Sequence, residues 1–189
     1  MGNDIFRGEL QLNSNELSDL AALHLACLFE KRSCHNVTKL KLDGNNFTSK
    51  TGEYIGQALV DNPRYPIKTI SFQGISLESI GLVRMMEAVN SNSCIKRLNI
   101  GTLTDDGLVA LSELLKSNCT LEELIFQETA DHQKFWTERG RGAFIETMRT
   151  STCLKKVKML YSREEETETD VEFKREISFY TQMKAKVAK

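Results

Sequence analysis

A short pattern of apolar residues returns along the chain at nearly constant intervals. In the clearest copy, which starts at Val37, apolar residues occupy the first, fourth and sixth positions, and a Gly-Asn-Asn turn follows. Further copies start at Ile67, Ile95, Leu121 and Leu154, so that successive starts lie 30, 28, 26 and 33 residues apart. A period of this length is typical of stacked-repeat proteins, in which each unit buries its apolar side against the next one. The chain is therefore predicted to be a repeat protein.

Each copy of this frame predicts a short β-strand, a turn and an amphipathic helix. Because side chains alternate along a strand, the fourth and sixth positions face the core, and the third and fifth face outward. Helices are expected over 51–60, 79–89 and 105–115, where apolar residues recur with the spacing of one buried helix face. Thr104 or Asp105 is placed to cap the last of these helices.

The frame also continues before and after its clearest copies. Counting back from Val37 puts another start at Arg7, which adds a sixth strand and a helix with the expected apolar stripe Leu17, Leu20, Ala21, Leu25 and Leu28. We expect a solenoid of about six strand-helix units over residues 1–160, an acidic linker over 161–170, and a C-terminal helix with a basic tail over 171–189. The last helix would cover the final repeat, which has no following neighbour to shield its core.

Composition and charge exclude several classes of function. Lys and Arg (25) nearly balance Asp and Glu (26), so the formal charge of -1 predicts no general attraction to nucleic acid or to a membrane surface. No apolar run approaches the roughly 20 residues that span a bilayer. The five cysteines and three histidines show no metal-ligand spacing, so neither a metal nor another cofactor is expected. Unpaired thiols indicate a reducing compartment, and the predicted location is cytoplasmic.

Enzymatic motifs are missing from the sequence as well. The segment 139–142 (Arg-Gly-Arg-Gly) is followed by Ala143 and Phe144, where a phosphate-binding loop needs Lys and then Ser or Thr. The histidines are scattered along the chain, and the carboxylates of Glu164, Glu165 and Glu166 fall in the predicted linker. We therefore expect no catalytic residues and predict that the protein is not an enzyme.

The order of strand, Asn-containing turn and amphipathic helix, with a repeat near 28 residues, resembles the leucine-rich repeat proteins of the ribonuclease-inhibitor type. The resemblance covers about residues 7–160, and the segments 92–95 (Asn-Ser-Cys-Ile) and 117–121 (Ser-Asn-Cys-Thr-Leu) look like helix-to-strand turns of that subfamily. It implies an α/β fold, a right-handed solenoid with parallel strands on the concave face, helices on the convex face and a C-terminal capping helix. In size and repeat number the chain is also similar to the C-terminal repeat half of the tropomodulin-type actin cappers. The loop around Trp136 does not map onto that group.

Two surfaces are candidate binding sites. The first is the concave strand face, which is polar and mixed in sign except for the apolar Ile125; its candidate residues are Lys39, Lys41, Arg97, Asn99, Glu123, Ile125, Lys156 and Lys158. The second is the insertion after the strand at 121–126, where Phe135 and Trp136 would form an exposed aromatic anchor. The alternatives are that the concave face is simply a solvated sheet, and that both rings fold back over the edge of a helix.

The function predicted from these surfaces is a non-catalytic scaffold that binds a protein partner, through the concave face or through the loop around Trp136. The sequence does not identify that partner. The resemblance to tropomodulin supplies an alternative, a cytoskeletal module that associates with actin, and a subunit of a larger assembly is a further one. A module that a pathogen secretes into a host cell is neither supported nor excluded.

Overall fold

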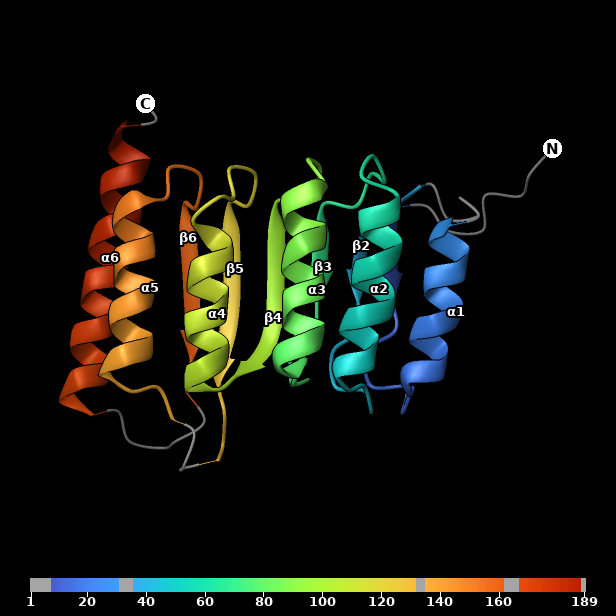
Figure 1. Cartoon of the computed structure of the whole chain (residues 1–189), viewed down its shortest axis with the longest axis horizontal. Helices are drawn as coiled ribbons and strands as arrows, with labels where there is room; N and C mark the ends of the chain where they lie inside the picture. The colour runs from blue at the N-terminus through green and yellow to red at the C-terminus, as the bar shows by residue number, and fades with distance from the viewer. Residues whose placement is uncertain (1–7, 31–35, 132–134, 162–166, 188–189) are drawn as a thin grey trace.

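Equal positions of successive repeats lie side by side in the folded chain. The computed structural model describes residues 8–30, 36–131, 135–161 and 167–187. Within these ranges, six strands form one parallel sheet in chain order: β1 (Gly8–Gln11), β2 (Val37–Lys41), β3 (Thr69–Ser71), β4 (Arg97–Leu103), β5 (Glu123–Glu128) and β6 (Lys156–Leu160). A helix follows each strand: α1 (Asp19–Glu30), α2 (Ser49–Asp61), α3 (Glu78–Ser91), α4 (Asp105–Leu115), α5 (Glu138–Thr150) and α6 (Glu168–Val187). Figure 1 shows the helices as a layer over one face of the sheet.

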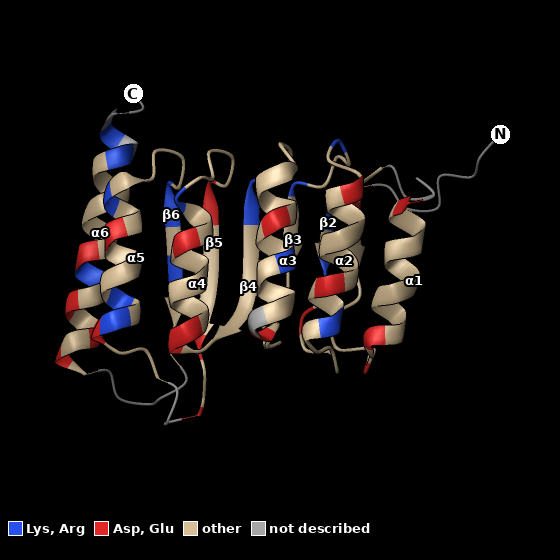
Figure 2. Cartoon of the chain, in the orientation of Figure 1, with Lys and Arg blue, Asp and Glu red and all other residues tan. Residues whose placement is uncertain are grey.

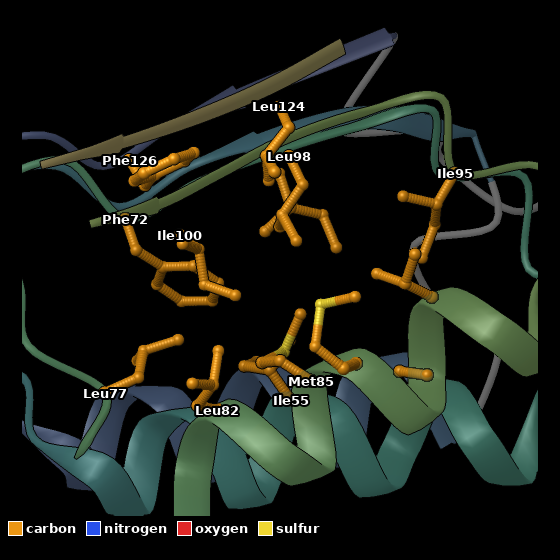
Figure 3. Packing of buried hydrophobic residues seen from close by; sticks show 14 of the residues in the cluster. Ile55, Phe72, Leu77, Leu82, Met85, Ile95, Leu98, Ile100, Leu124 and Phe126 are labelled. Atoms are coloured by element: carbon orange, nitrogen blue, oxygen red, sulfur yellow. The ribbon is translucent and has the colours of Figure 1, made fainter. Parts of the chain in front are cut away.

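The first, fourth and sixth positions of the frame line one continuous core between the two layers. Leu98 and Ile100 point from β4 toward Leu82 and Met85 of α3 (Figure 3), and all four side chains are at most 1% exposed. Complete burial of an aliphatic side chain of this size stabilises a fold by about 1.5–3 kcal/mol. Because each repeat adds such a layer against its neighbours, the units are stable together and not singly.

An asparagine in the turn after β2 joins the first two repeats. The amide nitrogen of Asn45 donates to the carbonyls of Leu12 and Leu42, each at 2.7 Å. Its amide oxygen accepts from the backbone N–H groups of Asn15 at 2.9 Å and Leu17 at 3.1 Å. A turn without regular pairing would otherwise leave these backbone groups without partners, which is costly wherever water is excluded.

Two further asparagines join repeats at the opposite edge, in the turns from helix to strand. The amide nitrogen of Asn92, which is fully buried, donates to the carbonyl of Tyr65 at 3.0 Å. Asn118 accepts from the N–H of Leu121 at 2.8 Å and donates to the carbonyl of Val89 at 3.4 Å. These two turns lie in the segments 92–95 and 117–121, which look like helix-to-strand turns of ribonuclease-inhibitor-type repeats.

The stripe expected for the first helix is wrong at Leu20 and omits Phe29, whereas its other members face the core. The buried residues of α1 are Ala22, Leu25, Ala26 and Phe29, whereas Leu20 is 61% exposed. Phe29 packs against Tyr65 with a ring-centroid distance of 4.8 Å. A large ring that meets the second repeat turns that side of the helix inward. Leu17, Ala21 and Leu28 pack partly buried against the core, and Leu20 remains near solvent.

Helix α6 starts earlier than the pattern of apolar residues indicates, at Glu168 instead of Val171. Thr167 and Asp170 form a reciprocal cap: the N–H of Thr167 donates to the Asp170 carboxylate at 2.8 Å, and the N–H of Asp170 donates to the Thr167 hydroxyl at 3.3 Å. Asp170 is fully buried and also accepts from Arg141 of α5 at 2.5 Å. This pairing fixes the start of α6 against the preceding helix, where Phe173 and Ile177 join the core.

Candidate functional site

The outward positions of the strands form a face that none of the helices α1 to α6 covers, which we call the open face. Strand pairing places the third positions of successive frames in one row, in the order Lys39, Thr69, Arg97, Glu123 and Lys156. The fifth positions form a second row, in the order Lys41, Ser71, Asn99, Ile125 and Lys158. Neighbouring strands lie about 4.8 Å apart, so adjacent members of a row are within reach of one another.

At the β1 end of the open face, one carboxylate lies between two lysines. Glu9 is 2.8 Å from the ammonium of Lys41 and 3.8 Å from that of Lys39. The hydrogen bond from Lys41 lowers the pKa of the Glu9 carboxyl, and the same bond raises the pKa of the Lys41 ammonium. Both groups therefore stay charged at neutral pH. The pairs are open to solvent, so they orient the side chains more than they stabilise the fold.

Toward the other end of the open face, Glu123 is shared by two cations. It accepts from Arg97 at 3.0 Å and from Lys156 at 2.5 Å. In Figure 2 the upper ends of β4 and β6 are blue, and the end of β5 between them is red. The carboxylate side chain is only 16% exposed, whereas those of Arg97 and Lys156 are 64% and 65% exposed. The cluster keeps one net positive charge and leaves its two cations exposed to solvent.

The remaining predicted residues of the open face differ in how much of them reaches solvent. Lys158 is exposed, and Ile125 is partly exposed, which places an apolar side chain next to the cations of β6. Asn99 is only 9% exposed, so the expectation of an accessible side chain there is corrected. Its oxygen accepts from the N–H of Gly101 at 3.2 Å, where an irregularity in the pairing of β4 with β5 turns the strand. The Asn99 side chain therefore stabilises the backbone of its own strand.

Trp136 does not form an exposed anchor, and the prediction of a binding role for its ring is corrected. The side chain is 3% exposed and its ring packs against Phe126 and Tyr161 at centroid distances of 5.3 and 5.4 Å. The indole N–H donates to the carbonyl of Leu103 at 3.1 Å. A large ring that is packed against other rings, with its only polar group satisfied, has its lowest free energy inside the protein.

Phe135, the neighbour of Trp136, is partly exposed and lines a groove of about 670 Å³. The groove lies where the helices α3 and α4 begin, and its wall includes Glu78, Asp105 and Asp106. Arg139 from α5 neutralises part of this charge, because it is 2.6 Å from Asp106 and 3.8 Å from Asp105. The insertion therefore contributes to a surface groove through Phe135, while Trp136 contributes to the core.

The arrangement of charges suits recognition of a charged surface. In the described part of the chain, no group of three or more His, Cys, Asp and Glu side chains is placed to hold a metal ion. Nor does any helix among those residues combine the length and the apolar character needed to cross a membrane. What the open face can do is orient a partner of complementary charge, because such patches govern association rate and register.

Sequence reasoning missed two cations at the rim of the open face, Lys68 and Lys96. They occupy the second position of the frame, immediately before β3 and β4, whereas the alternation within a strand turns only the third, fifth and seventh positions outward. A signal was present, because the second positions after Val37 read Thr38, Lys68, Lys96, Glu122 and Lys155. Most of these positions are cationic, which the strand pattern alone does not explain.

Comparisons with known proteins bear on the fold. No family model matches the chain, and no curated protein does. Among solved structures, leiomodin-1 actin-binding site 2 aligns with a TM-score of 0.54 and 14% identity, over 95% of this chain and 82% of that one. The tropomodulin C-terminal domain of Caenorhabditis elegans aligns with a TM-score of 0.62 and 13% identity, over 90% of this chain and 95% of that one. The chain thus has the leucine-rich-repeat-like α/β fold of these domains.

Proposed function

We propose that this chain is a non-catalytic protein-binding module of the cytoplasm, and that actin is its partner. The observation that carries the proposal is the likeness to leiomodin-1 actin-binding site 2, which extends over 95% of the chain. An alignment of that extent takes in nearly the whole sheet and its helices, so the framework that carries the open face is alike in the two folds. Fold alone does not assign a partner, so the proposal depends on a binding test.

Within this proposal the chain is a right-handed solenoid of the ribonuclease-inhibitor type, and α6 is its capping helix. The reason for the cap is physical. Without α6, water would reach the aromatic rings of the last repeats, those of Phe126, Trp136 and Phe144. The ring centroid of Phe173 on α6 lies 6.2 Å from that of Trp136 and 6.3 Å from that of Phe144. A solenoid without a cap exposes the apolar side of its last unit.

The direct test is co-sedimentation of the full chain with actin filaments at micromolar protein. We expect saturable binding that weakens by about tenfold when Arg97→Glu and Lys158→Glu are combined, because the variant turns attraction at the open face into repulsion. The matched control combines Lys50→Glu on α2 with Arg84→Glu on α3, which also reverses two cations, here on the helical layer, where Arg84 pairs with Glu87 at 2.6 Å. No binding of the wild-type chain would refute actin as the partner.

The broader function, binding of another protein through the same face, has a separate test. Crosslinking followed by pull-down is performed with the wild type and with the variant Ile125→Asp. The side chain of Ile125 is partly exposed, so this change is compatible with folding. We expect Ile125→Asp to weaken capture of the partner, since an apolar contact among cations is replaced by a carboxylate. A partner captured equally well by both proteins would place the interface elsewhere.

A further inference from the structure

A groove crosses the N-terminal ends of β2, β3 and β4 at the rim of the open face. Its volume is about 330 Å³, and its lining residues come from the starts of successive strands: Thr38, Lys39, Lys68, Thr69, Lys96, Arg97 and Glu122. We call it the rim groove. Four of these residues are cations and one is an anion, in a chain whose formal charge is -1.

The positive charge of the rim groove is balanced only in part, because Lys39 and Arg97 pair with Glu9 at 3.8 Å and Glu123 at 3.0 Å, whereas Lys68 and Lys96 have no carboxylate partner among the described residues. Glu122 already pairs with Lys155 at 3.0 Å, outside the groove. Lys96 donates to the carbonyl of Thr120 at 3.3 Å, which is a neutral acceptor. Among the residues that the structure describes, the ammonium of Lys68 has neither a hydrogen-bond acceptor nor an ion pair.

The backbone holds the residues that carry these charges side by side. The carbonyl of Lys68 accepts from the N–H groups of both Lys96 and Arg97, each at 3.0 Å. Like charges on adjacent strands destabilise a sheet. Residues that bind a ligand are expected to be among those that lower the stability of the fold. Three basic residues are thus held together at the lining of the rim groove, and the ammonium groups of Lys68 and Lys96 have no carboxylate partner among the described residues, which favours an anionic ligand.

We propose that the rim groove receives an acidic segment of a partner polypeptide, an inference that rests on the proposed protein-binding function and specifies the chemistry of the partner. Lys39 and Arg97 are two strands apart, or about 10 Å, which about three residues of extended chain would span. Separate carboxylates along such a segment match cations that are distributed over three strands. Long lysine side chains can follow them with little rearrangement of the backbone.

A phosphate group fits the rim groove less well than a row of carboxylates. Compact phosphate sites use free backbone N–H groups at a helix N-terminus or in a nest. Here the N–H of Lys68 already donates to the carbonyl of Thr38 at 2.7 Å, and those of Lys96 and Arg97 donate to Lys68. The strands start where the preceding helices end, so the nearest helix termini contribute carbonyl groups and not N–H groups.

The test measures binding of a fluorescein-labelled peptide of alternating Glu and Gly by fluorescence anisotropy, with the full chain. We expect saturable binding that weakens as NaCl is raised, because exposed charges are screened. The combination Lys68→Gln and Lys96→Gln should lower the affinity by about tenfold, since two ion pairs are lost. The control, Lys50→Gln with Arg84→Gln, removes two cations from the helical layer and should change the affinity less than about twofold.

The same variants separate a ligand site from a purely structural role. Because Lys68→Gln with Lys96→Gln removes repulsion, we expect its urea midpoint to be equal to or above that of the wild type while peptide binding falls. Equal loss of binding in the control, or no binding of the peptide by the wild type, would overturn the proposal. Tighter binding of inorganic polyphosphate or of phosphatidylserine vesicles than of the peptide would also overturn it, in favour of phosphate recognition.

Repeating the actin sedimentation with the rim-groove variant distinguishes this proposal from the function on which it rests. Loss of both peptide and actin binding supports both. Peptide binding without any actin binding refutes actin as the partner and leaves the groove supported. Unchanged actin binding by the variant refutes the rim groove as the contact and leaves the actin proposal in place.

Discussion

Replacement of Trp136 tests most directly how the end of the repeat stack is held together. This residue is the only tryptophan of the chain and is 3% exposed. Its ring contacts Phe126 of β5, Tyr161 after β6 and Phe173 of α6, at centroid distances of 5.3, 5.4 and 6.2 Å. One side chain thus joins the last two strands to the final helix.

The magnitude follows from what each substitution removes. Trp136→Ala leaves a large cavity and should lower the free energy of unfolding by about 3–5 kcal/mol. Trp136→Phe leaves a cavity of roughly 40 Å³, which costs about 1 kcal/mol, and also loses one hydrogen bond. The Leu103 carbonyl that accepted this bond keeps a second donor, the N–H of Thr129 at 3.1 Å. The lost bond should therefore cost only about 0.5–1.5 kcal/mol, for a total of about 2 kcal/mol.

The assay is equilibrium unfolding in urea, followed by circular dichroism because the variants lack the tryptophan reporter. The control is Phe135→Ala, a change in the adjacent and partly exposed ring that should cost less than half as much as Trp136→Ala. In the wild type, the emission of the buried indole should be blue-shifted and resist quenching by acrylamide. An unfolding free energy of Trp136→Ala within about 1 kcal/mol of the wild type, or strong quenching, would refute the reasoning.

Two further predictions concern local strain and acid stability. Gly101→Ala should lower the free energy of unfolding in urea more than Gly74→Ala does. Both glycines have positive φ (77° and 76°), but only a Cβ at Gly101 would collide with the backbone, at the carbonyl oxygen of Ile75. Equal losses of unfolding free energy would show that this close approach does not matter. Asp19 is the second case: partial burial alone would raise its pKa, but hydrogen bonds from Thr48 and Thr51 outweigh burial and lower the pKa below the usual 3.8. The charged carboxylate therefore stabilises the fold above pH 3.8 and loses this effect as the pH falls through the lowered pKa. Asp19→Asn should accordingly be less stable than the wild type at neutral pH and approach it in acid, as urea midpoints across this range would show, and a difference that is independent of pH would contradict the assignment.

Local sequence patterns were sufficient to predict the helices and strands whose buried residues recur at the same positions of the frame. The helix expected over 105–115 is α4, Asp105–Leu115, and its N-cap is Thr104, whose hydroxyl accepts from the N–H of Gly107 at 3.1 Å. The six parallel strands also follow from the frame, because each combines apolar residues at alternate positions with a turn after them. Both results depend on contacts within one repeat or between equal positions of two repeats, and such contacts are visible in one sequence.

The candidate site could be predicted only in part. The frame correctly places Lys39, Arg97 and Glu123 in one row, since register aligns equal positions. It does not show that Arg97 and Lys156 share one carboxylate, because that depends on how long side chains bend. It also missed Lys68 and Lys96, since residues before a strand do not follow the alternation of strand side chains.

The sequence by itself determined the repeat, the strand order and the general sign of charge on each position, because these properties recur at a constant spacing. Only the tertiary structure decided which aromatic rings are buried, and that Phe29 of α1 enters the core while Leu20 does not. Trp136 shows the reason: its burial depends on Phe126, Tyr161 and Phe173, and these residues become neighbours only when the last strands and α6 have packed. Burial is a property of the neighbours that the fold supplies, and an irregular insertion has no periodic pattern from which to predict them.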